Sequence, residues 1–287
     1  MLQTKGLHKG YTAKEVLRDV TLTFSEGTIY GLIGSNGSGK TTLLRCLSGI
    51  YRPDNGTVTM DETDVYDDPE AKTKIAFVDD TPGFNQLYSV RRQSEYYGAF
   101  YPDYSTESFD RYAKEFELNS KSNANNMSLG QKKKLAISLA LARNAEVLLL
   151  DEPENGMDNE ARRVFRNALR DAADNGSTVI LSSHDLSNIE DMCDEIIFLV
   201  EGKVIYSGTI DDLFAGISKW TIRTEKRDFK DAFLLEENDD LLTLVCKGNA
   251  KESADKLKAT GAEVISAEKL ALSDAYFLYK EMAKHEA

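Results

Sequence analysis

A glycine-rich loop is the feature that most constrains the fold of this chain. The string GSNGSGKTT occupies residues 34–42. It follows a short apolar run, Ile29–Ile33, and precedes an apolar-periodic segment that begins at Leu43. A buried strand, a tight turn and a helix N-terminus are therefore expected in that order. Glycines let successive backbone N–H groups point inward, and the helix N-terminus adds positive partial charge, so this geometry suits phosphate.

The same string predicts roles for individual side chains in a triphosphate site. The spacing G-x-x-x-x-G-K-[ST] allows Lys40 to reach the β- and γ-phosphates and the Thr41 hydroxyl to hold Mg²⁺. The residues predicted to contact ATP are Ser35, Asn36, Gly37, Ser38, Gly39, Lys40, Thr41 and Thr42. Chance would produce such a string in roughly one chain in a hundred of this length. Its position between a strand and a helix favours function over a loop that binds nothing.

Two acids follow another apolar run. Asp151 and Glu152 come directly after Val147–Leu150. An acid at the end of a strand beside a phosphate-binding loop is placed to bind the Mg²⁺ of a nucleotide. The next acid is then placed to polarise a water molecule for attack on the γ-phosphate. Without the glycine loop, two solvated acids at a strand end would be the simpler interpretation.

Composition limits the class of protein. The chain has 287 residues, of which 41% are hydrophobic, enough for one large domain or two smaller ones. No run approaches the roughly 18 apolar residues of a membrane span, and no signal-peptide pattern begins the chain, so we expect a soluble intracellular protein. The widely spaced Cys46, Cys193 and Cys246 are expected to be buried or incidental thiols. A net charge of −13 argues against a nucleic-acid partner but not against ATP.

Hydrophobic periodicity predicts an α/β fold. The expected strands lie within 2–24, interrupted by a turn at 9–12, and at 57–60, 75–78, 147–150 and 178–181. The expected helices span 89–101, 106–117, 132–143, 159–174 and 185–191, and a hairpin spans 196–206. Beyond the hairpin we expect strands at 219–223, 241–246 and 263–266 and helices at 250–259 and 273–283. The predicted domains are 1–216, with a mostly helical insert at about 84–126, and a small α/β appendage at 217–287.

A third string, MSLGQ, occupies residues 127–131, between the glycine loop and the pair Asp151-Glu152. With these three features the chain resembles the nucleotide-binding ATPase subunit of ABC transporters over about residues 1–215. The resemblance is carried by Ser128-Leu129-Gly130-Gln131 within the string MSLGQ at 127–131, which is similar to the family signature LSGGQ with Leu129 in place of one glycine. Ser128 and the Gly130 amide would lie at a helix N-terminus, aimed at a γ-phosphate. The following Lys132–Lys134 are expected to form a solvated helix face, and an added positive field is the alternative. The implied fold is a P-loop NTPase core with an antiparallel β subdomain, a helical insert and the C-terminal appendage.

The resemblance also implies a composite site and further site residues. In the family the signature helix serves the ATP bound by a second subunit, so two ATP molecules lie between two head-to-tail subunits. A homodimer is favoured because both half-sites are complete in this chain, and a heterodimer is the alternative. Tyr11 resembles the aromatic residue that stacks on adenine, with Val16 packing beside it. Asp158 resembles the acid of a loop that touches the other subunit. His184 resembles the switch histidine that contacts the γ-phosphate.

One position departs from the family pattern. After the strand at 75–78 the family normally carries a Gln, or sometimes a Glu, that reaches Mg²⁺ and the attacking water. The best match here is Asp80, with Asp79 as the alternative if the register slips by one. An aspartate is shorter, so it would need an intervening water to reach the metal. We expect Asp80→Gln to change turnover by less than about tenfold.

These expectations combine into one function. The resemblance implies an ATP-binding and hydrolysing subunit that powers transport through a separate integral membrane subunit, by ATP-driven dimer closure at the cytoplasmic face of the membrane. The ending at 272–278 resembles exporter-type ATPases of drug, peptide or lantibiotic export. The helical insert would dock the membrane subunit, with Phe84, Tyr88, Tyr96, Tyr97, Phe100 and Tyr101 as candidate contacts. The alternative is a soluble ABC ATPase that acts in assembly or regulation.

Overall fold

The computed structural model describes residues 1–12, 14–225, 229 and 232–285. The chain divides into two compact units. The first comprises Met1–His184, Met192–Asp194 and Leu199–Val204, and the second comprises Asp185–Asp191, Glu195–Phe198 and Ile205–Ala287. The domain limits 1–216 and 217–287 remain a proposal from the sequence.

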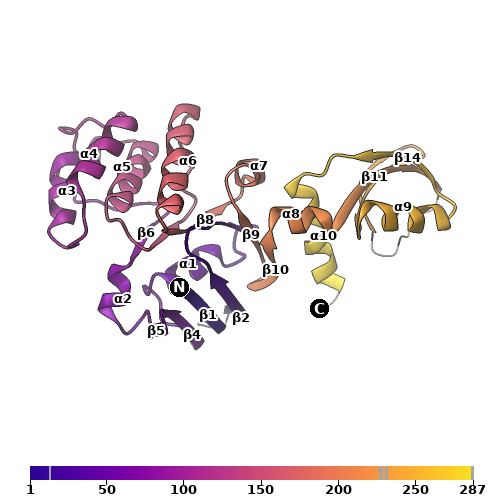
Figure 1. Cartoon of the computed structure of the whole chain (residues 1–287), viewed down its shortest axis with the longest axis horizontal. Coiled ribbons are helices and arrows are strands. Elements are labelled where there is room, and N and C mark those ends of the chain that lie inside the picture. The colour runs from indigo at the N-terminus through magenta and orange to yellow at the C-terminus, as the bar shows by residue number, and fades with distance from the viewer. Residues whose placement is uncertain (13, 226–228, 230–231, 286–287) are drawn as a thin grey trace. The chain divides into compact units, whose positions relative to one another are not determined.

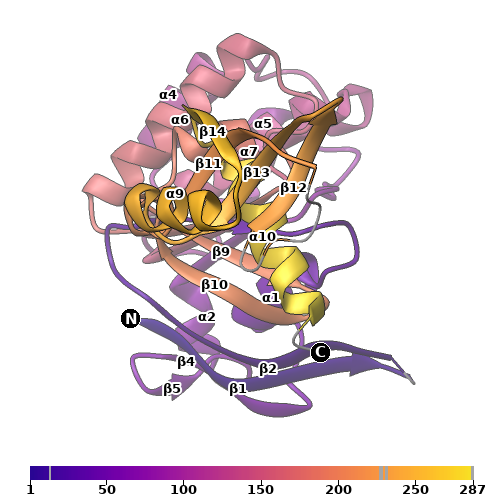
Figure 2. The same ribbon diagram turned by 90° about the vertical axis from the view of Figure 1, so that its right-hand side faces the viewer.

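An antiparallel sheet of order β2-β1-β4-β5 begins the first unit. Its strands are β1 (Leu2–Tyr11), β2 (Lys14–Phe24), β4 (Asn55–Met60) and the short β5 (Thr63–Asp64). Figure 2 shows β1, β2 and β4 side by side. Leu2 pairs with both Phe24 and Met60, and alternating side chains of β1 and β2 are buried. This sheet is the expected antiparallel β subdomain.

A parallel sheet forms the centre of the first unit. Four strands lie in the order β3-β8-β7-β6: β3 (Ile29–Ile33), β8 (Thr178–Ser183), β7 (Val147–Leu150) and β6 (Ile75–Val78). They pair in parallel, and every residue of β3, β7 and β8 is buried, as uninterrupted apolar runs predict. β9 (Glu195–Val200) and β10 (Lys203–Thr209) complete this six-stranded sheet, and the limit between the units falls within them. The carboxyl ends of the parallel strands share one edge, where open α/β sheets place their ligands.

Helices surround this sheet, and the main ones agree with the sequence prediction. They are α1 (Lys40–Leu47), α3 (Val90–Gly98), α4 (Thr106–Glu115), the 3₁₀ turn η1 (Ala124–Asn126), α5 (Leu129–Leu141) and α6 (Asn159–Asp174). In Figure 1 α3, α4, α5 and α6 gather in one part of the first unit. The short α2 (Pro69–Thr73), capped by Asp68, was not predicted. A buried cluster including Val90, Phe109 and Leu135 joins α3, α4 and α5.

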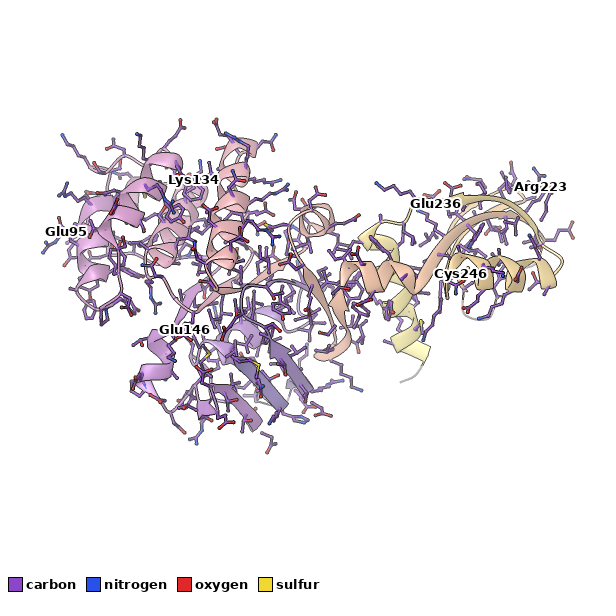
Figure 3. The ribbon with its side chains drawn as sticks, viewed as in Figure 1. Glu95, Lys134, Glu146, Arg223, Glu236 and Cys246 are labelled. Carbon is purple, nitrogen blue, oxygen red and sulfur yellow. The ribbon has the colours of Figure 1, made fainter. Side chains whose placement is uncertain are left out.

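The second unit has a four-stranded antiparallel sheet of order β12-β13-β11-β14. It contains β11 (Ile217–Arg223), β12 (Ala232–Asn238), β13 (Leu241–Lys247), β14 (Glu263–Glu268), α7 (Leu186–Glu190), α8 (Ile210–Ala215), α9 (Ala250–Ala259) and α10 (Leu272–His285). Its core includes Ile222, Leu244 and Cys246, the last labelled in Figure 3. β12 and α8 were not predicted. β12 pairs on one side only and ends in the exposed acids Glu236 and Glu237, so its sequence lacks a strand's usual alternation.

The three cysteines match the expectation from composition. All three cysteines are free and buried, and burial raises the pKa of Cys46 and of Cys246 to about 12. Thiols in such surroundings are poor nucleophiles. Within the described ranges, the helices are too short or too polar to cross a membrane.

Candidate nucleotide-binding site

The loop after β3 folds tightly enough that glycine is required. A Cβ atom added to Gly34 would lie 2.3 Å from the Ser38 hydroxyl and 2.4 Å from the Leu199 carbonyl oxygen. Gly39, which precedes α1, has a φ of 112°, a conformation that other residues rarely adopt. Lys40 is buried, and its ammonium group donates a hydrogen bond to the Gly34 carbonyl oxygen at 2.7 Å. The lysine is thus held against the loop that the phosphates would enter.

A cavity of about 450 Å³ opens over this loop. It is lined by Tyr11, Lys14, Val16, Asn36, Gly37, Gly39, Lys40, Thr41, Thr42, Asp80, Asp151 and Glu152. The volume is within the range of small-molecule sites. The structure therefore brings together most of the nucleotide residues predicted from the sequence. The hydroxyl of Ser38, a residue of this loop, is buried and has no hydrogen-bond partner in the part of the chain that the structure describes.

Asp151 and Thr41 meet at the end of β7. The Thr41 hydroxyl donates to one carboxylate oxygen of Asp151 at 2.7 Å, and the Ser182 hydroxyl donates to the other at 2.6 Å. Hydroxyl and carboxylate oxygens are the donors that Mg²⁺ accepts, so the residues fit this metal. The described residues contain no cluster of three or more His, Cys, Asp or Glu that could hold an ion. A Mg²⁺ that accompanies a nucleotide needs only one or two carboxylates, with phosphates and waters completing its shell.

Glu152 is held by contacts to three of its groups. Its φ of 46° lies in the left-handed region, which is unfavourable for a residue with a Cβ. Its N–H donates to the Ser182 hydroxyl at 2.9 Å, and its carbonyl oxygen accepts a hydrogen bond from Lys133. Its carboxylate lies 2.7 Å from Nδ1 of His184 and 3.7 Å from Nζ of Lys40. Such an outlier at a cavity is typical of functional sites.

The two acids after β6 take different partners. Asp79 accepts a hydrogen bond from Arg45 of α1 at 2.8 Å, and this bond raises the pKa of the arginine. Asp80 lines the cavity and accepts a hydrogen bond from Nζ of Lys133 at 2.6 Å. The expectation of a solvated face was wrong for Lys133, whose side chain is fully buried. Its spacing from the buried Gly130 and Ile137 places it on the buried stripe of α5, which is the signal that could have revealed it.

The signature segment begins α5. Ser128 is the N-cap, and it forms a capping box in which its hydroxyl accepts from the Gln131 N–H and the Gln131 side chain accepts from the Ser128 N–H. A Cβ added to Gly130 would lie 2.2 Å from the Gly156 carbonyl oxygen. Leu129, in place of the family glycine, is 47% exposed. A bulky residue is therefore tolerated at 129 but not at 130.

Asp158 connects the next loop to α5. Its carboxylate caps α6 by accepting from the Ala161 N–H at 2.8 Å, and Lys134 donates to it at 3.1 Å. These two contacts, the cap first, hold the pKa of Asp158 below its usual value. Lys134 is labelled in Figure 3.

The two N-cap serines of α4 and α5 allow a matched prediction. Ser128→Ala and Ser105→Ala each remove one side-chain cap, so each should lower the free energy of unfolding by about 1 kcal/mol. Only Ser128→Ala should also reduce ATP hydrolysis, by at least about tenfold, because a hydroxyl at the start of α5 is proposed below to contact a phosphate. Urea unfolding and steady-state ATPase rates measure the two effects. Equal rates for the two variants would contradict this role of Ser128.

The fold and the site define an ATPase of the P-loop class, and the comparisons define its family. The family model described as ABC transporter matches residues 17–155. The ABC transporter ATP-binding protein YtrB of Bacillus subtilis (strain 168) is 30% identical over 74% of this chain and 73% of its own length. The chain belongs to the ABC transporter ATP-binding proteins, which hydrolyse ATP to drive transport.

Two further relatives, both from Bacillus subtilis (strain 168), have names that describe different roles. The linearmycin resistance ATP-binding protein LnrL is 28% identical over 77% of this chain and 73% of its own length. The arginine transport ATP-binding protein ArtM is 26% identical over 75% of this chain and 93% of its own length. Among solved structures, the dimeric bacterial ABC transporter cassette MJ0796 superposes with a TM-score of 0.66 at 25% identity, over 73% of this chain and 99% of that one.

Proposed function

We propose that this chain forms an ATP-dependent homodimer that powers export through a separate integral membrane subunit. The observation that carries the proposal is the presence of both halves of a composite site on one chain. One half is the cavity with Lys40, Asp151 and Glu152. The other half is the start of α5, where Ser128 is exposed. The dimeric cassette MJ0796 supports assembly of two such subunits. A heterodimer with a related subunit is the alternative.

Hydrolysis would proceed mainly by positioning and charge stabilisation. Lys40 and the loop amides bind the phosphates, and Tyr11 and Val16 face the base. Thr41 and Asp151 would hold Mg²⁺, with Asp80 as a third candidate, and the ion would neutralise phosphate charge. Glu152 takes a proton from the attacking water and His184 holds the γ-phosphate.

Closure of the dimer would complete each site. Ser128 and Gly130 of a second copy approach the γ-phosphate bound to the first copy, and the dipole of their helix aids this contact. Asp158 of each copy lies in the loop that faces the other copy. ATP then favours the closed dimer, and its hydrolysis removes the preference.

The proposed docking surface for the membrane subunit lies on the first unit. A groove of about 270 Å³ is lined by residues including Ile50, Phe77, Pro82, Phe84 and Tyr97. Nearby in the sequence, Leu87, Tyr96 and Phe100 are exposed large apolar side chains, and Phe100 is 61% exposed. Phe84 and Tyr97 also pack against the core of the helical insert, so part of their role is structural. Docking at this surface would place the protein at the cytoplasmic face of the membrane.

The direction of transport is proposed from the end of the chain. Residues 272–278 resemble exporter-type ATPases, and LnrL is named for linearmycin resistance. Cells that lack this protein should therefore become more sensitive to at least one compound in a panel of drugs and antimicrobial peptides. Complementation with the wild-type protein, but not with Glu152→Gln, should restore resistance. A growth defect that is relieved only by a nutrient would instead indicate import.

Affinity capture tests the requirement for a membrane subunit. Tagged Glu152→Gln protein, loaded with ATP and mixed with detergent-solubilised membranes of the native cell, should retain one integral membrane protein. Phe100→Asp should lose it and still hydrolyse ATP. Retention of soluble proteins alone would favour the alternative of an ABC ATPase that acts in assembly or regulation.

A further inference from the structure

The buried ammonium group of Lys133 joins two segments of the nucleotide site. The exposed fraction of this side chain is 0%. Its Nζ donates to Asp80, which follows β6, at 2.6 Å, and to the main-chain carbonyl oxygen of Glu152, which follows β7. Burial of an ammonium group is strongly unfavourable unless the group is paired and hydrogen-bonded. The Asp80 carboxylate and the Glu152 carbonyl oxygen are therefore both needed to stabilise the buried ammonium group, and the ammonium group in turn fixes the position of both acceptors.

The first consequence concerns the backbone of Glu152. This residue has a φ of 46°, which is strained for a glutamate. Its N–H and its carbonyl oxygen are held by two different elements, by Ser182 of β8 and by Lys133 of α5. These two bonds fix the main chain from which the carboxylate of Glu152 projects toward His184 and Lys40.

The second consequence concerns charge in the cavity. Asp80 is 47% exposed and lines the cavity with Lys40 and Asp151. A free carboxylate there would repel the phosphates of ATP, because like charges close together are mutually unfavourable. The ammonium group of Lys133, hydrogen-bonded to Asp80, offsets that charge.

We propose that Lys133 is a positioning residue for ATP hydrolysis that neutralises Asp80 and fixes the main chain of Glu152. The same helix, α5, carries Ser128 and Gly130 at its N-terminus, so one buried lysine connects this chain's own ATP site to the segment offered to a second copy. The main role of Asp80 is then to pair with Lys133. The inference rests on the roles proposed above for Lys40 and Glu152.

Three variants separate the effect of Lys133 on the charge of Asp80 from its effect on the main chain of Glu152. Lys133→Met removes the ammonium group and keeps an apolar chain of similar length. We expect ATP binding in EDTA, measured with a fluorescent ATP analogue, to weaken about fivefold, and kcat with Mg²⁺ to fall about thirtyfold. In Asp80→Asn/Lys133→Met the negative charge at position 80 is removed together with the ammonium group that paired with it, so binding should return to within about twofold of wild type. The kcat of the double variant should stay at least about fivefold below that of the wild type, because the Glu152 carbonyl oxygen still lacks the hydrogen-bond donor that Lys133 supplied.

The third variant is the control. Lys132→Met removes a half-buried lysine one position away on the same helix and should change neither quantity by more than about twofold. The inference is wrong if Lys133→Met retains the kcat of the wild type. It is also wrong if the double variant binds ATP as weakly as Lys133→Met, since recovery depends on the charge of Asp80.

Folding and the identity of the site are tested separately. If Lys133→Met does not fold, Lys133→Gln supplies an uncharged donor, and it should fold, keep kcat within about tenfold and still bind ATP weakly in EDTA. Failure of every Lys133 variant to fold, including the double variant, would make the lysine purely structural and overturn the proposal. Lys40→Ala and Glu152→Gln are assayed in parallel. If these two variants hydrolyse ATP at the wild-type rate, the proposed site itself is wrong. If they lose hydrolysis while Lys133→Met keeps the wild-type kcat, only the proposed role of Lys133 is rejected.

Discussion

Glu152→Gln should reduce ATP hydrolysis by at least about a hundredfold while ATP still binds. The amide has nearly the shape of the carboxylate, so it can keep the contacts at 2.7 Å to His184 and at 3.7 Å to Lys40. It cannot accept a proton from water, and loss of a positioned base commonly slows a reaction by about 10² to 10⁴. Steady-state phosphate release measures the rate, and equilibrium binding of a fluorescent ATP analogue measures the affinity.

The same variant should also form a dimer when ATP and Mg²⁺ are added. Bound ATP favours the closed state, and without hydrolysis that preference persists. Size-exclusion chromatography with light scattering would show the mass double with ATP and remain that of a monomer with ADP. Glu160→Gln is the control, because Glu160 is an exposed acid in the first turn of α6 and should behave as wild type. A Glu152→Gln protein that binds ATP and stays monomeric would contradict homodimer formation.

Gly130→Ala should cause the second largest loss. The added methyl group would lie 2.2 Å from the Gly156 carbonyl oxygen and 3.0 Å from its carbonyl carbon, and both contacts are with backbone. Either the N-terminus of α5 or the loop that carries Gly156 must move. Because phosphate recognition depends on positions within about an ångström, we expect hydrolysis to fall at least about thirtyfold. Thermal unfolding should show a lower midpoint, since overpacking typically destabilises by about 1–3 kcal/mol.

The control for this substitution is another glycine with room for a methyl group. Gly216 has a φ of −88°, and a Cβ added there would meet its nearest neighbours at 3.5 and 3.6 Å, which is ordinary contact. Gly216→Ala should therefore keep the wild-type ATPase rate. If Gly130→Ala also keeps that rate, the close approach of Gly130 to Gly156 has no part in catalysis.

Local sequence strings predicted the centre of the site. The glycine loop determines its own geometry, because each turn and the start of α1 depend on residues within a few positions of one another. The apolar runs before Gly34 and before Asp151 predicted buried strands, and both are present as β3 and β7. Since parallel strands end at one edge of a sheet, the residues after those strands had to lie close together.

Other features depend on contacts between distant segments, and the sequence did not reveal them. Lys133 and Asp80 are 53 residues apart, and nothing in KKK distinguishes its middle lysine until the buried side of α5 is known. The partners of Asp79 and Asp80 were likewise undecided, since a shift of one residue in a short strand exchanges their directions. β12 was missed because an edge strand tolerates acids that a buried strand would exclude.

The sequence by itself determined the fold class and the chemistry of phosphate binding, since these follow from short-range backbone geometry and from hydrophobic periodicity. The family was implied by the resemblance of the string MSLGQ to the family signature, and the comparisons with known proteins confirmed it. Only the tertiary structure decided which charges pair and which glycine has no room for a side chain. Those facts are set by burial and by the approach of separate elements, as between Lys133 and Asp80 or between Gly130 and Gly156. The acceptors that keep the ammonium group of Lys133 buried follow β6 and β7, far from α5 in the sequence, so only the folded chain brings them together.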